Sequence, residues 1–96
     1  MTITKRVTFI AKDGASDIAK MKELLSAMVA PSKAEEGCLL YDIYQYENDP
    51  RKFMAVETWA DEKSLDGHKA SEHYAVYKSS YEPYCQSKYS DELIIL

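Results

Sequence analysis

The spacing of apolar side chains divides the chain into alternating predicted strands and helices. Apolar residues that recur at every second position predict a strand over residues 3–12. Spacings of three and four residues then predict an amphipathic helix over residues 16–34. Because proline cannot donate a backbone hydrogen bond, Pro31 is expected to kink or separate the last turn of this helix.

The middle of the chain predicts a β-hairpin. Residues 38–47 and 51–60 are rich in strand-forming side chains, and Asn48-Asp49-Pro50 between them has the composition of a turn. Such a short connection can only join antiparallel neighbours.

The last third of the chain predicts two helices and a strand. Asp61 can cap a short helix, Ser71 can start a second one, and residues 92–96 are expected to form a terminal strand. The resulting order of strand, helix, strand, strand, helix, strand is that of the ferredoxin-like split βαβ, an α+β fold with an antiparallel sheet. The predicted organisation is one domain over residues 1–96.

Both faces of the predicted hairpin carry apolar side chains. One face holds Leu39, Tyr41, Ile43, Phe53, Ala55 and Trp59, and the other holds Leu40, Tyr44, Tyr46, Met54 and Val56. A sheet with one face in water should alternate cleanly between apolar and polar residues, and two helices cover only one face. A second copy of the chain is therefore expected to cover the other face, which predicts a homodimer formed through the sheet.

Composition excludes several classes of protein. Among the 96 residues, 46% are hydrophobic and 29% are charged, which is a globular balance rather than a disordered one. The net charge of −4, without a basic block, argues against nucleic-acid binding. There is no apolar run of membrane-spanning length and no apolar signal core, so no membrane association and a cytoplasmic location are expected.

Glu57 is the first candidate for chemistry. It shares a strand face with Phe53 and Trp59, so its carboxylate is expected to lie among large apolar groups. Burial raises the pKa of a carboxyl group, which suits a general base near neutral pH. The alternative is structural: Glu57 accepts a hydrogen bond from a buried donor and fixes the core.

His68 and His73 are the only histidines of the chain. Histidine accepts protons near neutral pH, so His68 is a candidate base in a pocket wall, with an inert helix residue as the alternative. The two rings are five residues apart with no third ligand apparent in the sequence, so no metal site is expected.

Tyrosines recur every three or four residues near the end of the chain, at Tyr74, Tyr77, Tyr81 and Tyr84. This spacing predicts one helical stripe, which is typical of a core. Phenol hydroxyls at the edge of a core also suit a pocket for a flat, oxygenated aromatic ligand.

Three segments resemble the antibiotic biosynthesis monooxygenase (ABM) family. They are Glu36-Gly37-Cys38-Leu39-Leu40-Tyr41, Phe53-Met54-Ala55-Val56-Glu57-Thr58-Trp59 and His68-Lys69-Ala70-Ser71-Glu72-His73-Tyr74. The match in length and element order extends over essentially the whole chain, although Glu36 stands where many members have proline. The resemblance implies a dimeric α+β barrel with a pocket between sheet and helices in each subunit.

The resemblance also implies a cofactor-free reaction with O₂ on a small aromatic substrate such as a quinol. His68 or Glu57 is then the base, and the expected substrate-binding residues are Trp59, Tyr41, Phe53, His73, Tyr74 and Tyr77. Haem-degrading relatives use an Asn on the first strand and an axial His, whereas this chain offers no Asn there and has Lys78 at the position of the axial His. No flavin, nicotinamide or metal signature is present either.

Two other functions remain open from the sequence. A sugar-phosphate isomerase of the same superfamily needs a phosphate clamp, for which Arg6, Lys33 or Arg51 are available without forming a motif. The third possibility is a non-enzymatic dimeric protein that binds a small ligand.

Overall fold

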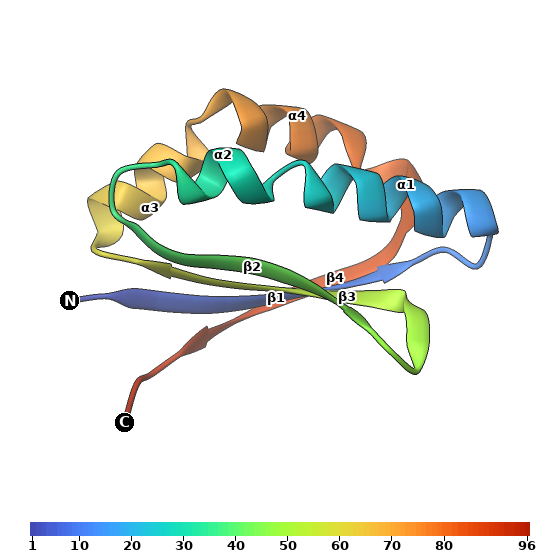
Figure 1. Cartoon of the computed structure of the whole chain (residues 1–96), viewed down its shortest axis with the longest axis horizontal. Helices are drawn as coiled ribbons and strands as arrows, with labels where there is room; N and C mark the ends of the chain where they lie inside the picture. Colours follow the sequence, from blue (N-terminus) through green and yellow to red (C-terminus); the bar gives the residue numbers. More distant parts are fainter.

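The computed structural model describes residues 1–96 as an antiparallel sheet with all of its helices on one face (Figure 1). The strands are β1 (Ile3–Ala11), β2 (Cys38–Tyr46), β3 (Asp49–Trp59) and β4 (Cys85–Leu93). The helices are α1 (Ala15–Ser26), α2 (Val29–Lys33), α3 (Glu62–Lys69) and α4 (Glu72–Ser80), followed by a 3₁₀ turn, η1 (Glu82–Tyr84). The strand order β2-β3-β1-β4 confirms the predicted ferredoxin-like α+β fold.

The first predicted helix is interrupted, and Pro31 explains where. The helix ends at Ser26 and resumes at Val29. Proline has no N–H to bond the carbonyl four residues earlier, and its ring clashes with that carbonyl, which here belongs to Ala27. Pro31 itself lies in the first turn of α2, where a missing N–H costs nothing.

The expected caps of α3 and α4 are present. The side chain of Asp61 accepts a hydrogen bond from the backbone N–H of Ser64 at 2.8 Å, and that of Ser71 accepts one from Tyr74 at 3.3 Å. The helix that carries the tyrosines ends at Ser80, and Tyr84 lies in the 3₁₀ turn η1, because Pro83 limits how far the helix can extend.

The predicted terminal strand over residues 92–96 was wrong in its position. The strand begins at Cys85 and pairs with β1 as far as Leu93 opposite Thr4, while the last three residues extend beyond the sheet. β4 is an edge strand that buries little, so polar residues are tolerated along it and the alternating pattern is lost.

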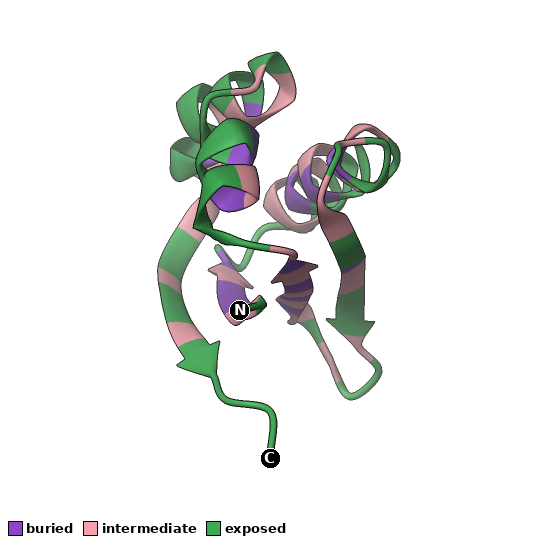
Figure 2. Cartoon of the chain, turned by 90° about the vertical axis from the view of Figure 1, so that its left-hand side faces the viewer, coloured by how far each residue is buried: buried purple, intermediate pink, exposed green.

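The core lies between the sheet and the helices (Figure 2). Alternate residues of β3 (Phe53, Ala55, Glu57 and Trp59) are buried there, as predicted. Leu39 was predicted to share this face, but its side chain is 59% exposed. A register shift between Cys38 and Leu40 interrupts the alternation of inward and outward side chains at this residue.

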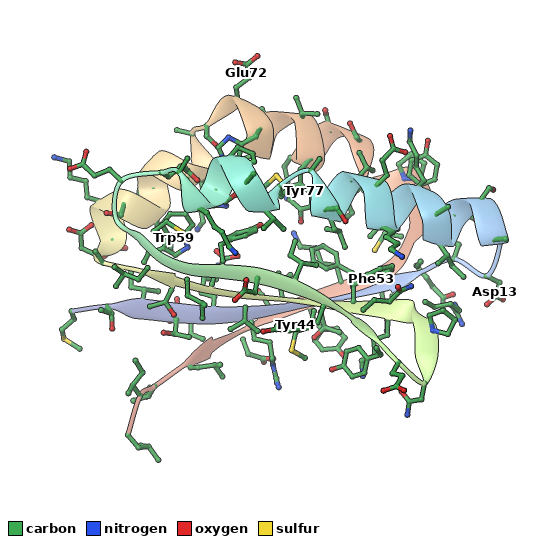
Figure 3. All side chains as sticks on the ribbon, in the orientation of Figure 1. Asp13, Tyr44, Phe53, Trp59, Glu72 and Tyr77 are labelled. Atoms are coloured by element: carbon green, nitrogen blue, oxygen red, sulfur yellow. The ribbon has the colours of Figure 1, made fainter.

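The opposite face of the sheet carries no helix and presents large apolar groups. Tyr44 is 57% exposed there, and Figure 3 shows it on the side of the sheet away from Phe53 and Trp59. Leu40, Tyr89 and Leu93 are also exposed, and Met54 and Val56 are half-buried. The apolar residues at both alternating sets of positions in the hairpin therefore do form a second apolar face, and this face is exposed in the single chain. None of the helices combines the length and the hydrophobicity of a membrane-spanning segment.

Candidate functional site

A cavity of about 70 Å³ lies between the sheet and the helices, and we call it the inner cavity. Its apolar lining comes from β1, β2, β3, α1 and α3, and from Met28 between α1 and α2. Its polar wall consists of Lys5, Tyr41, Glu57, His68, Lys69, Tyr74, Tyr77, Lys88 and Ser90. The volume is well below the roughly 300–1,000 Å³ of ordinary ligand pockets, so only a small ring or a part of a larger ligand can enter.

Glu57 is held by Trp59, two residues along the same face of β3. The indole Nε1–H donates to Oε1 of Glu57 at 3.0 Å, and both side chains are buried. The structural role weighed from the sequence therefore exists in this fold. Glu57 also lines the inner cavity, so its carboxylate contributes negative charge to the site.

His68 is the candidate base in the wall of the inner cavity. Its ring is 2% exposed and is tilted by 34° to that of Trp59, with the ring centroids 4.5 Å apart. The rings of Tyr41 and Tyr74 pack against it with centroid distances of 5.6 and 5.2 Å. Nδ1 is 2.5 Å from Oε2 of Glu35. An ionised carboxylate only accepts hydrogen bonds, so Nδ1 carries the proton and Nε2 is left with its lone pair free.

Glu35 was not among the residues predicted for the site. It lies in the loop between α2 and β2, and that loop runs beside α3 because Gly37 accepts a hydrogen bond from the backbone N–H of Ala60 at 2.8 Å. Gly37 has a φ of +83°, and a Cβ there would overlap the side chain of Ser64. Only glycine fits this position without strain, and its close approach to α3 places Glu35 at His68.

His73 also contacts Glu35, but it lines a different space from His68. Its Nε2 lies 3.1 Å from Oε2 of Glu35 and 3.3 Å from the hydroxyl of Ser71. His73 lines a groove of about 370 Å³ between α1 and α4, which we call the outer groove. Met28 and Tyr77 line both spaces, so they form the boundary between the outer groove and the inner cavity.

Glu35, His68 and His73 together offer three potential metal ligands, with the donor atoms within 4.8 Å of one another. The third donor, Glu35, was not apparent from the sequence, where only the two histidines were candidate ligands. The donor types suit a transition metal. However, two ligands of a tetrahedral zinc ion at ~2.0–2.1 Å lie roughly 3.3 Å apart, whereas Glu35 Oε2 and His68 Nδ1 are in hydrogen-bond contact at 2.5 Å. The arrangement therefore fits a carboxylate that orients two imidazoles, and the absence of a metal stays a prediction.

The buried tyrosines are suited to donating hydrogen bonds rather than to accepting protons. Burial, and after it the Glu57 carboxylate, raise the pKa of Tyr41, while burial and the neighbouring Tyr81 raise the pKa of Tyr77. Both phenols line the inner cavity and keep their protons at neutral pH. They can stabilise an oxyanion but cannot remove a proton from a substrate.

The fold thus separates the predicted site residues into three groups. His68, Glu57, Tyr41, Tyr74 and Tyr77 line the inner cavity, and His73 lines the outer groove. Trp59 lies behind His68, and Phe53 is 2% exposed within the core, so neither lines the inner cavity. Figure 3 shows both between the sheet and the helices.

The cations considered for a phosphate clamp lie elsewhere. Arg6 pairs with Asp91 at 2.9 Å, and Lys33 pairs with Asp42 at 3.2 Å. Arg51 pairs with Asp13 at 3.0 Å. None of the three lines the inner cavity, and each already has a carboxylate partner.

Comparison of the sequence with known families finds one match. The model of the antibiotic biosynthesis monooxygenase family matches residues 3–79. The Mycobacterium tuberculosis protein named "Putative monooxygenase Rv0793" is 36% identical over 59 residues, which are 62% of this chain and 57% of that protein. The matches to curated relatives thus span less than two thirds of their lengths.

Solved structures agree over the whole fold. The crystal structure of PA3566 from Pseudomonas aeruginosa superposes with a TM-score of 0.93 and 34% identity, covering 99% of this chain and 94% of that one. The structure of Rv0793 has a TM-score of 0.90 at 24% identity, covering 100% of this chain and 96% of that one, which shows a shared fold.

Proposed function

Because the chain belongs to the antibiotic biosynthesis monooxygenase family, we propose that it is a cofactor-independent monooxygenase that oxidises a phenol or quinol with O₂. The observation that carries this proposal is the Glu35–His68 pair in the wall of the inner cavity. A histidine held by a carboxylate at one nitrogen is a general base at the other.

The first step is removal of the substrate's phenol proton by Nε2 of His68. Glu35 keeps Nδ1 protonated, fixes the ring orientation together with Trp59, and stabilises the imidazolium that forms. The hydroxyls of Tyr41, Tyr74 and Tyr77 are available to donate hydrogen bonds to the phenolate oxygen.

The second step is reaction of the phenolate with O₂. The electron-rich ring carbon forms a C–O bond to O₂, which gives a hydroperoxide, and the O–O bond then breaks. One oxygen atom stays on the ring as the new quinone carbonyl. The other leaves as water with two hydrogens, so phenol and O₂ balance quinone and water. The substrate supplies all four electrons.

The two neighbouring spaces suggest how a substrate is held. The inner cavity has room for the reacting ring, and the outer groove can take the remainder of a larger molecule past Met28 and Tyr77. The apolar walls exclude water from the peroxide adduct.

The proposed assembly is a homodimer through the helix-free face of the sheet. Leu40, Tyr44, Tyr89 and Leu93 are each at least 39% exposed on this face. A monomer rarely leaves large apolar groups gathered on one surface, and a self-complementary contact covers them.

The test is an oxygen-electrode screen of benzoquinols, naphthoquinols and anthrones with protein that has been treated with a chelator. We expect uptake of one O₂ per substrate with at least one compound, and one ¹⁸O atom from ¹⁸O₂ in the product. If a compound binds but O₂ uptake never exceeds the uncatalysed rate, the protein is a non-enzymatic binding protein instead. A rise in melting temperature with sugar phosphates alone would instead favour the isomerase.

A further inference from the structure

Lys88 reaches from β4 into a cluster of aromatic rings at the inner cavity. Its Nζ lies 5.1 Å from the ring centroid of Tyr81, 5.4 Å from that of Tyr77 and 5.8 Å from that of Phe9. Tyr77 and Tyr81 stack at 5.0 Å, and Phe9 meets both rings edge-on. Ring faces attract a cation, but they do not neutralise its charge.

No carboxylate pairs with this ammonium group. The ion pairs of the lysines are Lys20–Glu23 and Lys33–Asp42, and neither involves the inner cavity. Burial, followed by repulsion from Lys78, lowers the pKa of Lys88, which is the expected behaviour of a partly desolvated cation without a counter-ion.

The cavity as a whole has the opposite charge to the chain. Its lining holds the three lysines Lys5, Lys69 and Lys88 against the single carboxylate of Glu57, whereas the chain carries a net charge of −4. Lys5 is partly buried and stands opposite Glu57 in the register of β1 and β3 without forming an ion pair with it, while Lys69 is exposed. An anion that enters this space therefore gains two nearby unpaired charges.

Lys88 and the base are separated by aromatic rings. Tyr74 packs against His68 at 5.2 Å and against Tyr77 at 5.5 Å, and Tyr77 in turn contacts Lys88. A ring that lies along these tyrosines can present a hydroxyl to His68 at one end and a second group to Lys88 at the other.

We propose that the inner cavity selects an aromatic substrate that carries an anionic group, a carboxylate on the ring, which binds Lys88 with support from Lys5. This rests on the proposed function only for the orientation of the hydroxyl toward His68. The anion site itself follows from the unpaired lysines and the aromatic rings around Lys88.

The test is the affinity for 4-hydroxybenzoate compared with its uncharged near-isostere 4-hydroxybenzamide, measured at pH 8 by calorimetry and by fluorescence of Trp59, the only tryptophan. We expect the wild type to bind the carboxylate at least ~10-fold more tightly than the amide. K88M should abolish this preference, and K88R should retain most of it.

K52M is the matched control. Lys52 also lies over a tyrosine ring, 4.5 Å from the centroid of Tyr46, but it does not line the cavity. We expect K52M to keep the wild-type preference. Equal affinities for the two ligands in the wild type, or an unchanged preference in folded K88M, would overturn the proposal.

Oxygen uptake separates the two proposals. If uncharged quinols react with the same kcat/KM as carboxylated ones, the anion site is refuted while the monooxygenase stands. If the carboxylate binds through Lys88 and no phenol consumes O₂, the anion site stands and the monooxygenase fails.

Discussion

The carboxylate of Glu35 meets Nδ1 of His68 at 2.5 Å, although the two residues are 33 positions apart in the sequence. One lies in the loop before β2 and the other in the last turn of α3. Their contact orients the ring of His68 and fixes its tautomer, which leaves Nε2 without a partner. His68 lines the inner cavity together with Tyr41 and Tyr74. The mechanism depends on this contact.

Replacing the carboxylate of Glu35 should weaken catalysis without weakening binding. Glu35→Gln removes the negative charge that stabilises the His68 imidazolium, so kcat should fall about 10- to 100-fold while KM changes little. Glu36→Gln is the matched control, because Glu36 is the next residue and is exposed. Equal kcat values for the two variants would show that Glu35 does not assist the base.

The Trp59–Glu57 hydrogen bond should contribute measurably to stability. Trp59→Phe leaves a buried carboxylate oxygen without its donor, so the free energy of unfolding should fall by about 1–3 kcal/mol from this contact alone. Urea unfolding of Trp59→Phe, Glu57→Met and the double variant isolates the pairwise coupling from the loss of ring volume, because methionine has a similar length and no oxygen to accept the indole N–H. A coupling near zero would contradict the pairing.

Alkaline pH should destabilise the protein through its buried tyrosines. Phenols ionise near pH 10 in an unfolded chain, whereas the pKa values of Tyr41 and Tyr77 are raised in the folded state. Above pH 10 the folded state therefore holds more protons than the unfolded state, and the free energy of unfolding falls as pH rises. Below pH 10 this contribution is fully present.

Melting temperatures between about pH 9 and 11.5 test this linkage. Tyr77→Phe should lose stability less steeply than the wild type. Tyr84→Phe, at a half-buried tyrosine of η1 that lies outside the proposed interface, should follow the wild-type curve more closely. Parallel curves for the wild type and Tyr77→Phe would argue against the raised pKa of Tyr77.

Association should depend on the helix-free face of the sheet. Val56 is half-buried near the centre of that face, so Val56→Lys places a charge in the proposed interface and should shift the protein toward an ~11 kDa species in sedimentation. Val76→Lys makes the same change on α4, where Val76 is 56% exposed, and should leave the dimer intact. A wild-type monomer at micromolar concentration would refute the dimer itself.

Local signals were enough to predict most of the fold. Patterns within a few residues were enough to predict the hairpin and the caps at Asp61 and Ser71. They also predicted which alternate residues of β3 are buried. β4 could not be predicted in this way, because an edge strand with polar side chains is defined by its pairing with β1, more than 70 positions away. Trp59 and Phe53 were expected to bind substrate, but an aromatic residue on the inner face can lie behind a cavity as readily as in its wall.

The site could be predicted only in part, for a similar reason. His68 and Glu57 are residue types with obvious chemistry on elements that were identified from the sequence. Glu35 is one of two adjacent glutamates in a loop, and nothing local distinguishes it from Glu36. The one available signal was Gly37, whose positive φ marks a loop that approaches another element closely.

The most direct test of the account is kcat of His68→Ala compared with that of His73→Ala on a phenol that the wild type oxidises, measured by oxygen uptake on folded protein. His68 lines the inner cavity, whereas His73 lines the outer groove and shares only the Glu35 carboxylate. A positioned base contributes roughly 100- to 10,000-fold, so His68→Ala should lower kcat at least ~100-fold and His73→Ala far less. Near-full activity in His68→Ala, together with its loss in Glu57→Gln, would instead make Glu57 the base and contradict the account.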